Sequence, residues 1–287
     1  MKKTIFLLIS ALIIVYVILS ILSSGGEYAA ERLLHRAVKI NEKIAANPDV
    51  VPPALFMAVE RNLEGIIKRY PNTKTAKVAR LALAEFYVTH KKFDGALLVL
   101  DGVINSNNED KVMLSKAHFL KGNAYEKQNQ WSKALIEYKM LRDKYKETSL
   151  GLQAPIYIGN YYKNNGKDAE ATKAYSEAVI FYEKLERENR GKTLGYLASN
   201  FLMQSYVNLR KYEAAGRVIE DAIDNYPSKL TYLQHAPNVE TIFVKILKKP
   251  QKAIEIYSRM KDKTDDNKFR EFLEKKINDL KAGEQGS

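Results

Sequence analysis

The stretch Gly-Asn-Ala-Tyr-Glu-Lys-Gln-Asn-Gln-Trp-Ser-Lys-Ala, residues 122–134, decides the fold. Gly122 lies three residues before an aromatic, Tyr125, and Ala134 lies nine residues after that aromatic. The same spacing occurs three more times, as Ala84–Tyr87–Ala96, Gly159–Tyr162–Ala171 and Met203–Tyr206–Ala215. The last alanine advances by 38, 37 and 44 residues from copy to copy. A recurring internal period of about 20 to 50 residues indicates a protein built from stacked repeats.

Each copy reads as two helices joined by a short polar turn. In the quoted copy the turn covers residues 127–130, and Ala134, Leu135, Tyr138 and Leu141 then follow at helical spacing. We expect the small residue of the first helix to lie where two helix axes cross closely, with the aromatic beside it and the alanine of the second helix against it. One hairpin cannot bury its apolar face alone, so neighbouring hairpins must stack. The sequence therefore predicts an all-α solenoid of helical hairpins.

The pattern resembles that of the tetratricopeptide repeat (TPR) family. Besides the small, aromatic and alanine positions, that family has a second aromatic three residues before the alanine, which Phe93, Trp131 and Tyr212 match and Asp168 does not. A Tyr-Pro pair, Tyr226-Pro227, ends a helix as in the family. The resemblance covers roughly residues 54–262, with a half unit before the first copy and a degenerate fifth copy around Ala253. It implies a right-handed α-solenoid whose first helices line a groove.

The N-terminal segment differs from the rest of the chain. Residues 5–22 are apolar without a single charge, and Lys2 and Lys3 precede them. As a helix, this segment is about 27 Å long, close to the thickness of a hydrocarbon core. We expect an uncleaved single-pass anchor in the plasma membrane, with a cytoplasmic N-terminus and periplasmic repeats, as in TPR proteins of the bacterial cell envelope. The alternative is a cleaved signal peptide, whose apolar region is about 7–15 residues long.

These patterns divide the chain into four expected parts. They are an anchor over residues 1–26, a juxtamembrane helix with a proline-rich linker over 27–53, the repeats with a C-terminal capping helix over 54–281, and a tail over 282–287.

The composition argues against catalysis, against metal binding and against nucleic-acid binding. The chain has no cysteine, and its four histidines are scattered, so neither thiol catalysis nor a metal-binding motif is indicated. Arg190–Thr193 resembles the end of a phosphate-binding loop, but Glu186 stands where that loop requires glycine. We therefore expect no enzyme, no cofactor and no metal. The net charge of +12 is spread along helix surfaces without a nucleic-acid motif, so no nucleic-acid partner is expected.

The TPR resemblance implies that partner-binding residues lie on the first helix of each hairpin, next to the structural positions. Amides suit this role because they both donate and accept hydrogen bonds, which makes Asn123 and Asn160 the foremost candidates. Helix capping is an alternative role for Asn164 and Asn208, which come near helix ends. The candidate groove residues are Glu85, Asn123, Glu126, Lys127, Asn160, Lys163, Asn164, Gln204 and Asn208.

A scaffold or adaptor that binds a protein or peptide in the cell envelope is the function these features favour. Two alternatives stay open. One is a structural component that self-assembles as a homo-oligomer, and the other is a chaperone-like ancillary subunit of a secretion or envelope-assembly machine.

Overall fold

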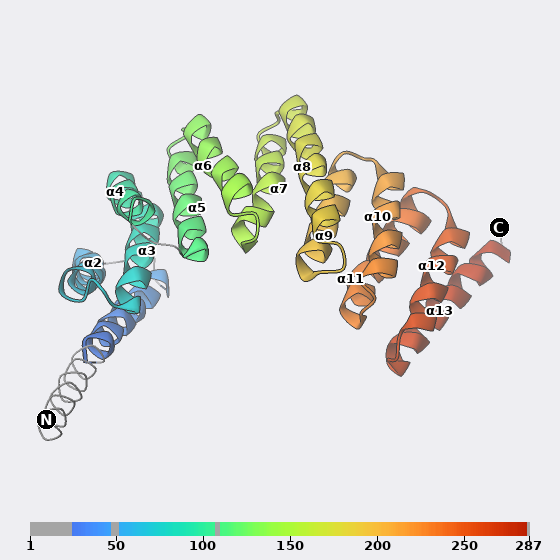
Figure 1. The fold of residues 1–287 in the computed structure, drawn as a ribbon, viewed down its shortest axis with the longest axis horizontal. Helices are drawn as coiled ribbons and strands as arrows, with labels where there is room; N and C mark the ends of the chain where they lie inside the picture. Colours follow the sequence, from blue (N-terminus) through green and yellow to red (C-terminus); the bar gives the residue numbers. More distant parts are fainter. Residues whose placement is uncertain (1–24, 47–51, 107–109, 286–287) are drawn as a thin grey trace, which may run out of the picture. The chain divides into compact units, whose positions relative to one another are not determined.

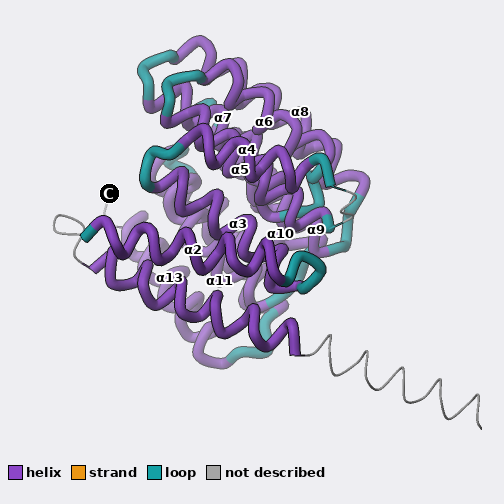
Figure 2. The backbone as a smooth tube through the Cα atoms, turned by 90° about the vertical axis from the view of Figure 1, so that its left-hand side faces the viewer, coloured by secondary structure: helices purple, strands orange, loops and turns teal. Residues whose placement is uncertain are grey.

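The computed structural model describes residues 25–46, 52–106 and 110–285. The chain divides into two compact units, the first ending at Met140 and the second beginning at Leu141, so the boundary falls inside one helix. All regular secondary structure in the described ranges is helical, with short loops between the helices (Figure 2). Stacked helical hairpins occur in each unit, which confirms the predicted α-solenoid.

Unit 1 is built from alternating first and second helices. Residues 25–46 are helical and are followed by α2 (Pro53–Arg69), α3 (Lys74–Thr89), α4 (Phe93–Ile104), α5 (Lys111–Lys127) and the beginning of α6 (Trp131–Lys144) (Figure 1). Ala30, Ala37 and Ile44 of the helix over residues 25–46 share one buried cluster with Leu63 of α2 and Phe86 of α3. The apolar face of this N-terminal helix is therefore part of the repeat core.

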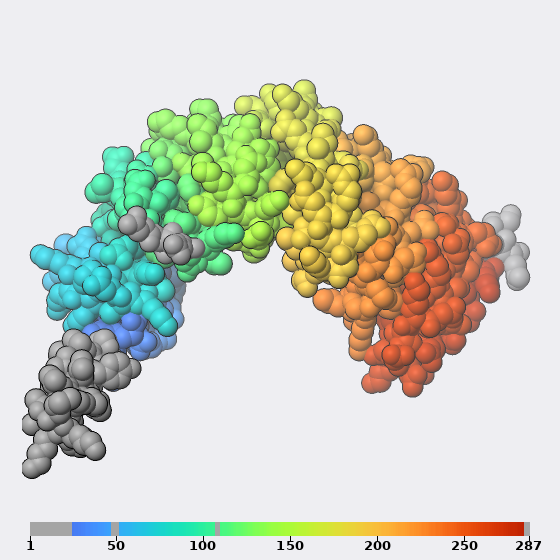
Figure 3. Space-filling view, viewed as in Figure 1, coloured from blue at the N-terminus to red at the C-terminus, as the bar shows by residue number. Residues whose placement is uncertain are grey.

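Unit 2 continues the alternation. It holds the end of α6, then α7 (Ser149–Asn164), α8 (Asp168–Glu188), α9 (Thr193–Asn208), α10 (Tyr212–Asn225), α11 (Lys229–Val239), a π-helix η1 (Glu240–Ile246), α12 (Pro250–Lys263) and α13 (Asn267–Gln285). In Figure 3 the yellow, orange and red segments of this unit lie side by side in chain order. The long period between Ala171 and Ala215 is accommodated by α8, which has 21 residues.

Four hairpins share one turn, and the pattern tyrosine closes it through its backbone. The Tyr87 carbonyl accepts a 2.8 Å hydrogen bond from the Lys92 N–H, and the equivalent bonds join Gln130 to Tyr125, Lys167 to Tyr162 and Lys211 to Tyr206, each at 2.9 Å. One residue between the partners adopts a left-handed conformation: Lys91, Asn129, Gly166 or Arg210, with φ from 57° to 68°. This is the Schellman motif that ends many helices. The nine-residue spacing from aromatic to alanine is therefore constant because the turn has the same length in all four hairpins.

The last hairpin contains one extra residue. Its turn-closing bond joins the Lys249 N–H to the Phe243 carbonyl at 2.7 Å, and Lys248 takes the left-handed conformation with φ of 55°. Phe243 therefore precedes Ala253 by ten residues rather than nine. The additional residue is taken up by the π-helix η1, since a π-helix spaces its hydrogen bonds one residue further apart than an α-helix.

The close helix crossings are filled by rings from the second helix. A Cβ added at Gly122 would lie 2.7 Å from Cε1 of Tyr138, and one added at Gly159 would lie 2.4 Å from Cε1 of Tyr175. Each of these tyrosines comes four residues after the pattern alanine of its second helix. The pattern tyrosines themselves are half-buried, so the ring packed over the small residue is not the one expected from the spacing.

The expected membrane topology is corrected by the structure. The predicted anchor, residues 5–22, lies outside the described residues. Within the described ranges, no helix has the length and apolar character needed to cross a membrane. Two of them, α10 and α12, are strongly amphipathic, with one face packed in a core and the other carrying charges. The prediction of a single-pass inner-membrane protein with periplasmic repeats is therefore wrong on this finding.

Candidate partner-binding surface

The predicted groove residues lie on the first helices of hairpins in both units. Unit 1 holds Glu85 on α3 together with Asn123, Glu126 and Lys127 on α5, and unit 2 holds Asn160, Lys163 and Asn164 on α7 together with Gln204 and Asn208 on α9. Each set is considered within its own unit.

Two of these side chains accept hydrogen bonds from buried tyrosines of the second helices. Glu126 Oε2 accepts a 2.8 Å hydrogen bond from the Tyr138 hydroxyl, and Asn160 Oδ1 accepts a 2.7 Å bond from the Tyr175 hydroxyl. The two donors are the tyrosines that cover Gly122 and Gly159. These bonds fix the orientation of the Glu126 carboxylate and the Asn160 amide. Both half-buried residues therefore stabilise their hairpins by joining the first helix to the second.

The remaining candidates differ in exposure. Lys127, Lys163, Asn164 and Gln204 are exposed, whereas Asn123 and Asn208 are half-buried. The alternative capping role predicted for Asn164 is performed by its neighbour: Asn165 Nδ2 donates a 2.8 Å hydrogen bond to the Tyr161 carbonyl.

Glu85 lies at the rim of a pocket in unit 1, which we call the N-terminal pocket. Its volume is about 370 Å³. Helix 25–46, α2 and α3 form its walls. The lining residues are Leu34, Ala37, Val38, Asn41, Glu42, Ala45, Val59, Leu63, Ala82, Glu85, Phe86 and Thr89. Val59, Leu63 and Phe86 are buried and give an apolar floor, while Glu42, Glu85 and Thr89 are exposed at the rim.

A capping interaction holds two walls of the N-terminal pocket together. The carboxylate of Glu27 accepts hydrogen bonds from the backbone N–H groups of Lys74 and Thr75, both at 2.9 Å, and from the Thr75 hydroxyl at 2.6 Å. It thereby binds the start of helix 25–46 to the first turn of α3, whose free N–H groups favour a negative charge. The Thr75 hydroxyl bond is the main reason that the pKa of Glu27 lies below its usual value.

The rim of the N-terminal pocket carries two carboxylates, and the ion pairs that these carboxylates form are weak. Glu85 lies 3.4 Å from the Lys116 ammonium with 55% of its side chain exposed, and Glu42 lies 2.8 Å from that of Lys39. Exposed pairs of this kind contribute at most about 1 kcal/mol, so an incoming donor can replace them. The arrangement suits an apolar side chain on the floor and hydrogen-bond donors at the rim.

Half of the N-terminal pocket comes from helix 25–46, which sequence reasoning did not include among the site residues. Its pocket-lining members are Leu34, Ala37, Val38, Asn41, Glu42 and Ala45, and each lies three or four residues from another of them. That period was readable as an amphipathic helix, but nothing in the sequence shows that α3 lies opposite.

No group of three or more histidine, aspartate or glutamate side chains in the described part of the chain is placed to hold a metal ion.

Comparison with known protein families matches one segment of the chain. Residues 116–148, which contain the quoted stretch, match the tetratricopeptide repeat family. The match supports a tetratricopeptide-type helical hairpin in this segment, and repeats of this kind generally mediate protein–protein interaction.

Two solved structures are similar to the chain at low identity. BtubC (BKLC) from P. vanneervenii is 12% identical, with 92% of this chain and 93% of that one covered and a TM-score of 0.34. A tetratricopeptide repeat protein from Parabacteroides merdae is 13% identical, with 87% and 99% covered and a TM-score of 0.33. The search of curated protein sequences gave no match.

Proposed function

We propose that this protein is an adaptor that binds a protein partner through the N-terminal pocket. The observation that carries the proposal is the combination of a pocket of about 370 Å³, an apolar floor, and Glu85, a predicted groove residue, at its rim. The exposed groove residues Lys163, Asn164 and Gln204 are proposed contacts within unit 2.

The N-terminal pocket supports binding for a physical reason. Its walls are helices that are already ordered, so the protein itself loses little conformational entropy when a partner segment docks. Val38, which is 45% exposed, and the buried Phe86 both line the pocket, and an apolar side chain placed against them gains about 25 cal/mol for each Å² removed from water. The carboxylates of Glu42 and Glu85 accept hydrogen bonds from the partner and set its orientation.

Site-specific photo-cross-linking of the full-length chain in its native cells tests the proposal. A photoreactive amino acid is placed at Val38 or at Thr89, both of which line the N-terminal pocket, and at Lys68 as a control. Lys68 is exposed on α2 and does not line the pocket. We expect the same discrete product from positions 38 and 89, absent at position 68 and reduced when Glu85→Arg is introduced.

The mass of the product distinguishes the alternatives. A product with the mass of this chain plus a different protein supports the adaptor. A product with twice the mass of this chain indicates self-assembly instead, and equal labelling at all three positions would remove the N-terminal pocket as the binding site.

A further inference from the structure

A pocket in unit 2 lies between α11 and α13, and we call it the α11–α13 pocket. Its volume is about 550 Å³, a size that is common for binding pockets. Leu233, Ala236 and Pro237 line it on α11, and Phe269 and Phe272 line it on α13. Ala236 and Phe269 are buried, whereas Leu233 is 47% and Phe272 is 44% exposed. The pocket therefore offers accessible apolar side chains to a partner.

The charged residues of this lining stand where α11 and α13 begin. Lys229, the first residue of α11, forms an ion pair with Asp266, which directly precedes α13. Lys268 in the first turn of α13 is exposed. A single exposed lysine is screened by water and salt, so it selects an acidic partner only weakly. Further along both helices the lining is apolar.

Two first helices of unit 2, α9 and α11, carry almost no charge. α9 has 16 residues and contains no lysine, arginine, aspartate or glutamate, and neither does the stretch 230–239 of α11. Such residues make up 28% of the whole chain, so their absence here sets these two helices apart. Leu197 of α9 is 40% exposed and Leu230 of α11 is 66% exposed. The uncharged surface of these helices is therefore partly apolar.

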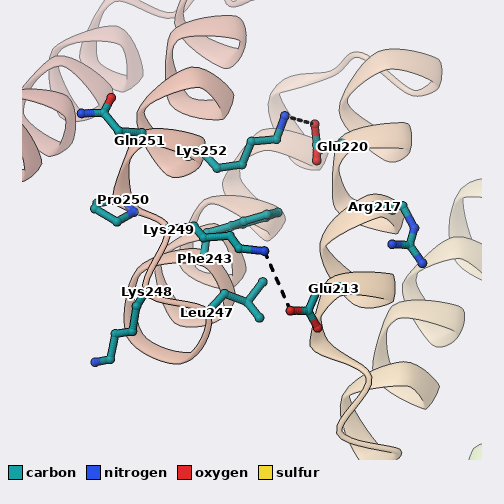
Figure 4. Close-up of a pocket in the computed structure, with 10 residues that line it drawn as sticks. All are labelled: Glu213, Arg217, Glu220, Phe243, Leu247, Lys248, Lys249, Pro250, Gln251 and Lys252. Carbon is teal, nitrogen blue, oxygen red and sulfur yellow. Dashed lines mark ion pairs between the residues drawn. The ribbon is translucent and has the colours of Figure 1, made fainter.

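The charges of this part of the chain lie on the second helices and pair with one another. In Figure 4, dashed lines join Lys249 and Lys252 at the start of α12 to Glu213 and Glu220 on α10. The Lys252 ammonium lies 2.9 Å from the Glu220 carboxylate, and the Lys249 ammonium lies 3.9 Å from that of Glu213. These pairs contrast with the uncharged surface of α9 and α11.

Two hydrogen-bonding groups at the α11–α13 pocket suit a peptide main chain. Oε1 of the exposed Gln234 accepts a 2.7 Å hydrogen bond from the Tyr196 hydroxyl of α9, which directs the Nε2 group of the same amide away from that hydroxyl. Among the described residues, Nε2 has no acceptor. Pro237 has no N–H, so the Leu233 carbonyl lacks the hydrogen bond that residue 237 would donate in a regular α-helix. A donor and an acceptor thus stand next to each other.

We propose that the α11–α13 pocket and the adjoining surface of α9 and α11 bind an apolar peptide segment that has no charged side chains. Its apolar side chains contact Leu233 and Phe272, and its main chain bonds with Gln234. A charged side chain in the segment would lose water without gaining an opposite charge, which is costly. The inference rests on the proposed function for the contact at Gln204 on α9 alone, since the N-terminal pocket belongs to unit 1.

A peptide fits this surface better than a lipid bilayer. Helices that lie on membranes combine an apolar face with many lysines and arginines, and α9 has neither residue type. Acyl chains cannot accept a hydrogen bond from Gln234, so this donor would lose water without finding a partner. The carbonyl groups of a peptide supply that partner.

Fluorescence anisotropy with the full-length chain tests the inference. The probe is a fluorescein-labelled peptide in which leucine alternates with glutamine. Three control peptides carry aspartate in place of every glutamine, lysine in place of every glutamine, or alanine in place of every leucine. We expect each control peptide to bind at least about tenfold more weakly, because the first two bring unpaired charges and the third lacks the apolar contact.

Matched variants separate the pocket from general apolar adhesion. The pocket variant combines Leu233→Gln with Phe272→Gln. The control variant combines Ile180→Gln with Ile246→Gln, two exposed apolar residues of unit 2 that do not line the pocket. We expect the pocket variant to bind the leucine–glutamine peptide about tenfold or more weakly, and the control variant to change its binding less than about threefold.

Gln234→Glu tests the selection against charge. The substitution replaces the amide donor by a carboxylate at the same place. We therefore expect this variant to bind the lysine–leucine peptide more tightly than the leucine–glutamine peptide, which reverses the order found for the unmodified chain. A change in apolar contact does not produce such a reversal.

Four outcomes would overturn the inference. The first is no binding of the leucine–glutamine peptide by a chain that circular dichroism shows to be folded. The second is an equal loss in the pocket and control variants, or a charged peptide that binds the unmodified chain as tightly as the probe. The third is a dimer, detected by light scattering, that is lost in the pocket variant, which identifies a second copy as the occupant. The fourth is binding of phosphatidylcholine vesicles, lost in the pocket variant, without binding of the peptide.

The inference and the proposed function can fail separately. Cross-linking at Val38 and Thr89 reports on the N-terminal pocket in unit 1, whereas the peptide experiments report on Leu233, Gln234 and Phe272 in unit 2.

Discussion

Gly159 lies directly against the ring of Tyr175, so close that a Cβ at position 159 would be 2.4 Å from Cε1 of the ring. The ring has little freedom to retreat. Tyr175 is 2% exposed, and its hydroxyl donates a 2.7 Å hydrogen bond to Asn160 Oδ1. One glycine thus sets both the approach of α7 to α8 and the orientation of the neighbouring amide.

Gly159→Ala is expected to lower the free energy of unfolding by about 1–3 kcal/mol, because the added methyl group overpacks the crossing. Urea unfolding followed by circular dichroism measures the change. Gly102→Ala on α4 is the matched control, since nothing beyond the backbone of its own helix and its chain neighbours lies within 4 Å of its Cβ position, and alanine favours a helix by up to about 1 kcal/mol. If both variants are as stable as the unmodified chain, the Gly159 contact is looser than described.

Tyr175→Phe is expected to cost about 0.5–1.5 kcal/mol through the lost hydrogen bond to Asn160. A double-mutant cycle with Asn160→Ala isolates this interaction, because both single variants remove the same bond. Strictly additive free energies in the double variant would show that the two side chains are not coupled.

Arg210→Gly is expected to stabilise the protein by about 0.5–1 kcal/mol. Arg210 closes its turn with φ of 57°, a left-handed conformation that costs about 1–2 kcal/mol for a residue with a Cβ and little for glycine. Part of this gain is offset because glycine is more flexible in the unfolded chain. Gly166→Ala is the reverse experiment at the equivalent turn, where φ is 68°, and its melting temperature should fall. A lower melting temperature for Arg210→Gly would contradict this account of the turn.

Stability is expected to fall on acidification because of His235. This residue on α11 is fully buried, and neither ring nitrogen has a hydrogen-bond partner in the part of the chain that the structure describes. Burial lowers the pKa of His235 from 6.5 to about 4. Above pH 6.5 both states are neutral and stability is complete. As the pH falls from 6.5 through about 4, only the unfolded chain binds the proton, so roughly 3 kcal/mol is lost.

Urea unfolding across this pH range tests the expectation, with His235→Leu as the comparison. The variant should lose most of the pH dependence. A smaller slope should remain, because burial also lowers the pKa of His90. An identical pH profile for both proteins would exclude His235 as its source.

Sequence alone predicted the hairpins well because local chemistry encodes them. The spacing from Tyr125 to Ala134 is constant because the turn between them always has the same length. That turn is closed by a hydrogen bond between residues only a few positions apart. The sequence does not encode equally well which ring covers which small residue. Tyr138 was visible as an apolar position of a second helix, but the contacts of Tyr138 and Tyr175 with Gly122 and Gly159 depend on how two helices cross.

The candidate site was predictable only in part. Glu85 was identified from its place beside the structural positions of α3, and it lines the N-terminal pocket. The opposite wall, which includes Val38, was not identified because its position depends on the packing of helix 25–46 against α3. The fifth copy was predicted only in part for another reason: Phe243 precedes Ala253 by ten residues, which departs by one from the nine-residue spacing of the other copies.

That departure has a consequence for how such a chain can evolve. An extra residue in an α-helix rotates everything after it by about 100°, which would turn buried side chains of the hairpin toward water. In the last hairpin the wider π-helical turns absorb the residue before the chain reaches α12, and Ala253, Ile256 and Tyr257 stay in the core. The hairpin can therefore gain or lose a residue without repacking its neighbours, so new surface can arise at the turn while the inherited interior is kept.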